Sequence, residues 1–143
     1  MRRVAEDRDI CAIAPLLAPL QLRGCRLANR VAMAPMSRYA SGGGVPGPDV
    51  GAYYARRAAS GLGLLVTEGV GVAHPLAVDH PGVPRLHGEA ALQGWRRVVE
   101  AVHDVGGVIW PQLWHQGAMW NVEYDGGARA SALRPSNSKW LSA

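Results

Sequence analysis

Three apolar stretches of the chain each run directly into hydrogen-bonding side chains. The first leads into Ser37, the second into Thr67 and Glu68, and the third into Gln112. In a parallel α/β protein, ligands bind and catalytic residues gather at the carboxyl ends of the strands. Hydroxyl, carboxylate and amide groups at three such ends would face one site. The pattern therefore indicates an enzyme whose polar groups converge there.

The elements that must position these side chains follow from the apolar patterning. We expect strands over about residues 31–36, 62–67 and 108–113. A helix over Val50–Ser60, with Asp49 as its N-cap, is expected between the first two strands. Pro111 removes a ladder N–H from the third strand, so we expect a local bulge there that shifts Gln112.

The second helix has the clearest apolar periodicity in the chain and is expected to end at Gly106–Gly107. Its apolar face is expected to carry Leu92, Trp95, Val99 and Val102. The order β-α-β-α-β predicts adjacent parallel strands in the order 1-2-3. A hairpin near Leu20–Leu27, turning at Arg23–Gly24, is expected to cover the N-terminal end of the sheet.

Composition limits the classes of partner and compartment. The net charge is +4, but the 15 basic residues occur singly or in pairs with acids between them, which argues against a nucleic-acid binder. The N-terminal apolar stretch is interrupted by Pro15 and Pro19 and is too short to span a membrane. Cys11 and Cys25 form no disulfide framework or metal motif, so we expect a reduced, cytoplasmic protein.

A glycine-rich loop leaves a second interpretation open. Gly42–Gly47 formally matches the dinucleotide-binding pattern G-x-G-x-x-G, and Glu68 lies about where a ribose-binding acid would stand. Two details weaken a Rossmann-like nucleotide site. Five residues separate the first strand from the glycines, and Pro46 and Pro48 lack N–H groups for a pyrophosphate. The other interpretation is a flexible lid loop before a helix.

The chain also resembles a known family in several motifs that occur in order. Asn29–Tyr39 and Tyr53–Leu62 are similar to the first strand and first helix of the Old Yellow Enzyme family, the FMN-dependent NAD(P)H:flavin oxidoreductases and ene-reductases. Thr67–Gly69, Gly94–Trp95, Val102–His103 and Gln112–His115 follow in the order of that family. The resemblance extends from about residue 16 to about residue 135.

The family fold is a (β/α)8 TIM barrel with FMN at its C-terminal mouth, and a complete barrel needs about 250 residues. The resemblance therefore implies one partial α/β domain over residues 1–143, about three βα units from the N-terminal part of the barrel, truncated on the C-terminal side. The inward strand faces would then lack the strands opposite them. Candidates for those faces are Val31, Met33, Leu65 and Ile109.

The resemblance assigns cofactor-binding roles residue by residue. Pro35 and Met36 match the segment that lies along the flavin, and Ser37 matches the side chain that meets it near O4 and N5. Gly69 matches a small residue under the ring, and Gln112 matches the glutamine that bonds the pyrimidine edge.

The substrate side of the pocket is implied at Trp114 and Tyr39. We interpret Glu68 as a buried, paired carboxylate that supports the barrel mouth. The family commonly continues Gln-Leu-Trp-His with Gly-Arg, which is absent here, because Gln116–Ala118 follows. The catalytic residues are unknown, since the family's substrate-binding His/Asn pair, Tyr proton donor and phosphate-binding loop match positions beyond residue 143. The histidine spacings fit no metal motif, so no metal is expected.

The expected function is that of an FMN-dependent NAD(P)H oxidoreductase of the ene-reductase type. It would pass hydride from reduced flavin to an activated alkene or a related small-molecule acceptor. The alternative is a non-catalytic fragment or split-barrel subunit that needs a partner. The expected partners are a small-molecule substrate and either a second copy of the chain or the C-terminal part of the barrel, with no nucleic acid and no membrane.

Overall fold

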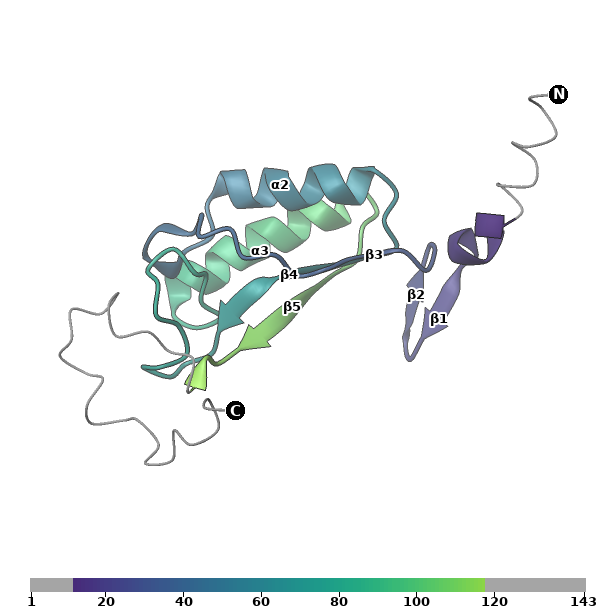
Figure 1. The fold of residues 1–143 in the computed structure, drawn as a ribbon. Helices are drawn as coiled ribbons and strands as arrows, with labels where there is room; N and C mark the ends of the chain where they lie inside the picture. The colour runs from purple at the N-terminus through teal and green to yellow at the C-terminus, as the bar shows by residue number, and fades with distance from the viewer. Residues whose placement is uncertain (1–11, 118–143) are drawn as a thin grey trace, which may run out of the picture.

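The computed structural model describes residues 12–117. After a short helical segment at residues 12–17, the elements lie along the chain as Figure 1 shows. They are β1 (Leu20–Leu22), β2 (Cys25–Leu27), β3 (Ala32–Met33), the 3₁₀ turn η1 (Gly42–Gly44), α2 (Pro48–Ala59), β4 (Leu64–Gly71), α3 (Glu89–His103) and β5 (Ile109–Trp114).

A three-stranded parallel sheet forms the centre of the molecule. Its order is β3-β4-β5, with Met33 opposite Leu65 and Leu65 opposite Ile109. The expected order and direction of the strands are therefore confirmed. β3 is shorter than expected and β4 extends four residues further, to Gly71.

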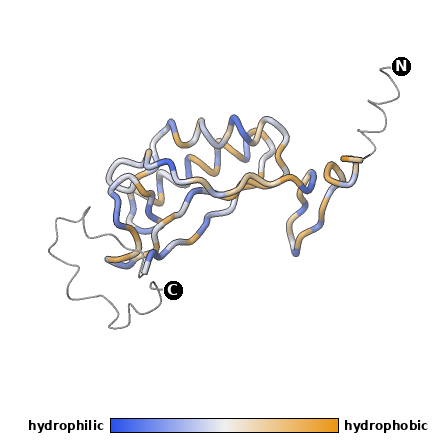
Figure 2. The backbone as a smooth tube through the Cα atoms, in the orientation of Figure 1, coloured by the Kyte–Doolittle hydropathy of each residue, from blue (hydrophilic) through white to orange (hydrophobic). Residues whose placement is uncertain are grey.

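Helices α2 and α3 lie together over one face of the sheet (Figure 1). Along both helices hydrophilic and hydrophobic residues alternate (Figure 2), which is the pattern of a helix with one buried side. The core between helices and sheet contains Met33, Leu65, Ile109 and Val70 from the strands. Three of the four residues expected to face the barrel interior therefore face the helices instead. Only Val31, 37% exposed, lies outside this core.

Strand β4 carries one residue more than β5 along their shared ladder. Val66 pairs with Trp110 and Gly69 with Gln112, so β4 advances by three residues while β5 advances by two. The bulge expected from Pro111 is present, but the extra residue belongs to the neighbouring strand. This arrangement suits a proline, because the bulged strand does not need an N–H donor from the position opposite.

The helices begin and end close to the expected residues. α2 starts at Pro48 after Gly47, so Asp49 lies in the first turn and is not the N-cap. Proline at the first helical position needs no N–H partner, which explains the earlier start. In α3 the buried face is formed by Ala91, Trp95, Val98 and Val102. Leu92 is 46% exposed, so its assignment to the buried face was wrong.

The N-terminal hairpin forms as expected. β1 and β2 pair antiparallel, with Leu22 opposite Cys25, and the turn residue Arg23 has a φ of 50°. The hairpin is a separate two-stranded sheet that lies beyond the N-terminal end of the parallel strands (Figure 1). The following segment is attached to the main body by the Asn29 side chain, which donates to the Gly61 carbonyl at 2.6 Å.

Candidate functional site

The candidate site lies at the carboxyl ends of the three parallel strands. Gly69 and Gln112 are direct partners in the β4–β5 ladder. The segment after β3 reaches the same place, because the Arg38 N–H donates to Glu68 Oε2 at 2.9 Å. Ser37 and Gly69 are the chain neighbours of these two residues. The sequence-predicted polar residues are therefore brought to one edge of the sheet.

Thr67 connects the bulge of β4 to β5. Its hydroxyl accepts the Gln112 N–H at 3.1 Å and donates to the Glu68 carbonyl at 2.7 Å. The Thr67 side chain thus satisfies a backbone donor at the point where the ladder is irregular. The sequence placed Thr67 among the strand-end residues but gave it no role. The one sequence feature that could have indicated this role is Pro111 in the third strand, because the bulge expected there disrupts the ladder and gives a side-chain acceptor such as the Thr67 hydroxyl a role.

Glu68 is buried, with 1% of its surface exposed, as expected. Burial raises the pKa of the Glu68 carboxyl, and the hydrogen bond from the Arg38 N–H opposes that shift. Its hydrogen-bond partner is a backbone N–H, so the carboxylate is held by the loop after β3. Within residues 12–117 the second oxygen, Oε1, has no hydrogen-bond partner. A buried carboxylate with one unpaired oxygen favours its neutral form.

Tyr54 of α2 supports Glu68 from the helix side. The Tyr54 hydroxyl accepts the Glu68 N–H at 2.9 Å. Desolvation raises the pKa of Tyr54 to about 12. The phenol therefore stays protonated at ordinary pH, and it fixes the bulged backbone against α2.

Two guanidinium groups stack on one tyrosine ring beside this cluster. The Arg38 and Arg57 Cζ atoms lie 3.6 and 3.3 Å from the centroid of the Tyr53 ring. Each contact is a cation–π interaction, which joins the loop after β3 to α2. Arg38 is thus held through its ring contact and through its backbone N–H, which positions the adjoining Ser37.

Four of the five residues assigned to the flavin are exposed at this edge, and the fifth, Gly69, is buried. Pro35, Met36, Ser37 and Gln112 are exposed, and within residues 12–117 neither the Ser37 hydroxyl nor the Gln112 amide has a side-chain hydrogen bond. An amide offers a donor and an acceptor together, which matches the N–H and carbonyl on the flavin pyrimidine edge. The chemistry of this donor set fits FMN.

Only glycine fits at position 69, because the Trp114 side chain lies against it. A Cβ atom built on Gly69 would collide with the indole of Trp114, whose ring lies over that position. A residue without a side chain is therefore needed at 69 because of Trp114, and the expected contact of Gly69 with the flavin ring stays a prediction. Trp114 is half-buried and lies at the end of β5, on the site.

Tyr39 lies at the edge of the site and contacts the following loop. Its ring lies 4.5 Å from that of His80, and its φ is 54°. The glycine loop is bonded to the same segment, because the Gly44 N–H donates to the carbonyls of Ser41 and Pro81. That N–H is occupied by protein acceptors, which argues against the pyrophosphate cradle of the Rossmann alternative.

A histidine pair joins the end of β5 to the loop after β4. His115 Nε2 lies 2.9 Å from His74 Nδ1. Because the Gly117 N–H donates to His115 Nδ1 and the Leu76 N–H to His74 Nδ1, His115 must be the donor of the pair. The sequence gave no sign of this contact, because 41 residues separate the two histidines.

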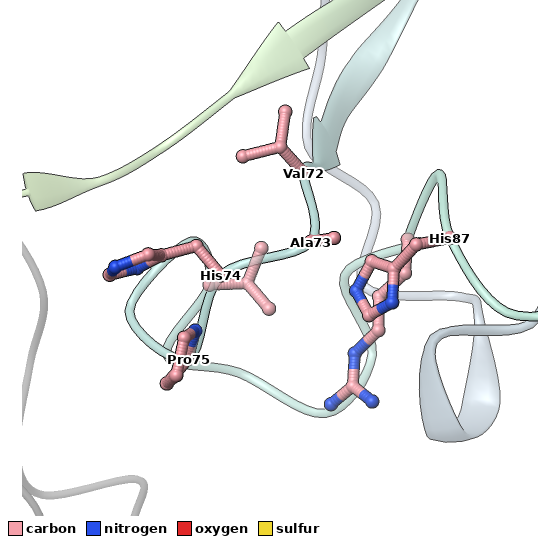
Figure 3. Close-up of a pocket in the computed structure, with 7 residues that line it drawn as sticks. Val72, Ala73, His74, Pro75 and His87 are labelled. Carbon is pink, nitrogen blue, oxygen red and sulfur yellow. The ribbon is translucent and has the colours of Figure 1, made fainter.

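A pocket opens beside this pair, past the end of β4 (Figure 3). Its volume is about 360 Å³, and it is lined by Val72, Ala73, His74, Pro75, Val78, Arg85 and His87. Among residues 12–117 no cluster of three or more His, Cys, Asp or Glu side chains could hold a metal ion. No helix in the same range is long and apolar enough to cross a bilayer.

Known proteins are similar to this chain in both sequence and fold. Residues 15–139 match the model of the NADH:flavin oxidoreductase / NADH oxidase family. The chain is 39% identical to rice (Oryza sativa subsp. japonica) 12-oxophytodienoate reductase 7 over 143 residues, 98% of this chain and 36% of that protein. It is 36% identical to Arabidopsis thaliana 12-oxophytodienoate reductase 2 over 107 residues, 75% of this chain and 28% of that one.

Solved structures with similar sequences also superpose on this chain. Morphinone reductase in complex with tetrahydroNAD superposes with a TM-score of 0.67 at 42% identity, over 72% of this chain and 28% of that structure. The old yellow enzyme homologue from Zymomonas mobilis superposes with a TM-score of 0.71 at 32% identity, over 78% and 31%. The chain thus spans about a third of the proteins it matches and forms part of their TIM barrel. It belongs to the NADH:flavin oxidoreductase / NADH oxidase family, the Old Yellow Enzyme family.

Proposed function

We propose that the protein to which this chain belongs is an FMN-dependent NAD(P)H oxidoreductase of the ene-reductase type. The observation that carries the proposal is the meeting of Gly69 and Gln112 in one ladder position, with Ser37 beside them, in a chain of this family. Bound FMN would supply hydride transfer between a reduced nicotinamide and an activated alkene or related acceptor.

The chain's own residues would hold and tune the flavin. Gln112 would bind the pyrimidine edge through its amide, with its backbone fixed by Thr67. Ser37 would donate a hydrogen bond where negative charge builds up in the reduced ring, which stabilises that charge. Pro35 and Met36 would offer an apolar surface along the ring, and Trp114 and Tyr39 would border the space for the acceptor.

The names of the relatives support the acceptor class. Reductases named for 12-oxophytodienoate and for morphinone act on ketones by name. A carbonyl withdraws electrons from a conjugated carbon–carbon double bond, which makes its β-carbon a hydride acceptor. We therefore propose a small enone as substrate of the whole protein. The remaining partners would be the C-terminal part of the barrel or a second copy of the chain.

The test uses the full-length protein with FMN added. Gln112→Leu removes both hydrogen-bonding groups of the amide and nearly keeps the volume, so flavin affinity is expected to fall by about tenfold. Gln93→Leu, on the exposed side of α3, is the matched control. Flavin retention is measured by absorbance after gel filtration, and NAD(P)H oxidation is measured with cyclohexenone.

Two results would contradict the proposal. A wild-type protein that folds and binds no FMN would remove the cofactor assignment. Equal flavin affinity in the wild type and the Gln112 variant would remove the role of the amide. Flavin binding without enone reduction would support the alternative of a non-catalytic barrel.

A further inference from the structure

Arg85 is fixed at the end of β4 by contacts of its backbone. Residue 85 forms a parallel bridge with Gly71, the last residue of β4. The Arg85 N–H donates to the Gly44 carbonyl at 2.9 Å, and its own carbonyl accepts the indole N–H of Trp95 at 3.0 Å. The side chain of Arg85 therefore begins from a defined point beside the site.

The stem of the same side chain is also packed. A Cβ atom built on Gly44 would lie 2.8 Å from both Cγ and Cδ of Arg85, so the stem runs closely along this glycine. The guanidinium beyond the stem lines the pocket and is exposed to solvent. Within residues 12–117 it forms no ion pair and no hydrogen bond. A cation that is held in place and left unpaired is suited to a ligand's charge.

The rest of the lining favours an anion with an apolar body. His74 and His87 lie on opposite sides of the pocket (Figure 3), and the lining contains no carboxylate. Glu89, two residues after His87 in the chain, accepts a hydrogen bond from the Gln93 side chain at 2.7 Å. Val72, Pro75 and Val78 supply apolar surface. A volume of about 360 Å³ holds a phosphate or carboxylate together with part of the group that carries it.

The pocket adjoins the proposed flavin edge. Val72, which lines it, donates its N–H to the Trp114 carbonyl at 3.2 Å. Val72 lies three positions after Gly69, which in an extended strand is a span of about 10 Å. A ligand whose anionic group occupied the pocket would thus extend toward Gly69 and Gln112.

We propose that this pocket binds the phosphate or carboxylate group of the electron donor or acceptor, with Arg85 as the charged residue and His87 as a second donor. The identity of the ligand, an electron donor or acceptor, rests on the proposed function. The anion site itself rests only on the pocket and on Arg85, which the structure contains without flavin.

The experiment compares Arg85→Gln with Arg97→Gln in the full-length protein. Arg97 is exposed on α3, outside the pocket, and the two changes remove the same charge. The first measurement is the rise in Tm with sodium pyrophosphate at constant ionic strength. We expect the rise in the wild type and in Arg97→Gln and its loss in Arg85→Gln, because only a ligand that binds the folded state raises Tm. No rise in the wild type would overturn the anion site.

The second measurement identifies the source of the anion in the FMN-bound enzyme. KM and kcat are determined for NADPH, for NADH, and for an enone carboxylate and its methyl ester. Arg85→Gln should raise KM by about tenfold for whichever ligand carries the anion and leave kcat unchanged. A rise for NADPH alone assigns its extra phosphate, a rise for both nicotinamides assigns the pyrophosphate, and a rise for the carboxylate alone assigns the acceptor.

Arg85→Lys covers the case in which Arg85→Gln does not fold. It keeps the stem and the charge and loses the bidentate fork, so KM should rise by less than in Arg85→Gln and still exceed that of the wild type. An unchanged KM for all four ligands in a folded Arg85 variant would overturn the proposal. If FMN itself fails to bind, the pyrophosphate measurement still decides the anion site.

Discussion

Thr67 accepts the backbone N–H of Gln112 through its side-chain hydroxyl, at 3.1 Å. A backbone amide of one strand is thus satisfied by a side chain of the next, at the position where β4 carries its extra residue. The contact fixes the backbone of the residue proposed to bind the flavin. It links the irregularity of the sheet directly to the geometry of the site.

Replacing Thr67 with Val should leave the Gln112 N–H without its acceptor. We expect a loss of about 0.5–1.5 kcal/mol in the free energy of unfolding, the net contribution of a typical hydrogen bond, because Gln112 is exposed and its N–H can turn to water. Urea unfolding of the full-length protein measures it. Thr67→Ser keeps the hydroxyl and loses the methyl group, so it is the control. A loss in Thr67→Ser with none in Thr67→Val would show that packing of the methyl group, and not the hydrogen bond, is responsible.

Glu68 should make stability depend on pH. Since burial raises its pKa, the folded state binds the proton more tightly than the unfolded chain. This contribution is fully present below the ordinary pKa of 4.5 and is lost as pH rises through the raised folded value. Glu68→Gln removes the titration. The unfolding free energy of the variant minus that of the wild type should therefore increase as pH rises above 4.5. A difference that does not change with pH would disprove the assignment.

Gly69→Ala should displace the Trp114 indole, because the added methyl would occupy its place. We expect a loss of about 1–3 kcal/mol, typical of overpacking. The double variant Gly69→Ala/Trp114→Ala tests the cause. If the indole is the obstruction, adding Gly69→Ala to Trp114→Ala should cost much less than adding it to the wild type. Equal costs would place the strain in the backbone.

Residues 1–143 expressed alone should be poorly soluble and retain little flavin. Within the described residues β3 and β5 are both edge strands, and Trp110 and Leu113 of β5 are 40% and 61% exposed. Unpaired edges and exposed apolar side chains favour association. Gel filtration and an absorbance spectrum of the purified chain measure both properties. A yellow, monomeric product that oxidises NAD(P)H would show that the chain is self-sufficient.

The sequence predicted the topology well because glycines and apolar runs mark the elements sharply. The strand order, both helices and the hairpin turn at Arg23 are confirmed. It was harder to predict which side chains each helix and strand buries. Leu92 fits the helical period almost as well as its neighbour Ala91, and only packing against the sheet decides which of them is buried.

Contacts between distant loops could not be predicted. His74 meets His115 and Tyr39 meets His80 because two βα loops and a strand end converge in space. Neither pair has a periodic spacing that a sequence pattern could reveal. By contrast, the sequence did predict that Ser37 and Gln112 lie at the same edge of the sheet, since parallel strands must end at one edge, although β3 ends four residues before Ser37.

The single extra residue in β4 also sets the direction of every side chain after it. Leu65 and Val70 both pack on the helices, although five positions apart in a regular strand they would point to opposite sides. Deleting one residue at 67 or 68 would remove this irregularity, and Val70, then four positions after Leu65, would still face the helices. The deletion would instead remove a side-chain contact, either that of Thr67 with the Gln112 N–H or that of Glu68 with the Arg38 N–H. A single-residue deletion here should therefore preserve the buried face of the strand and change the contacts at the edge of the site.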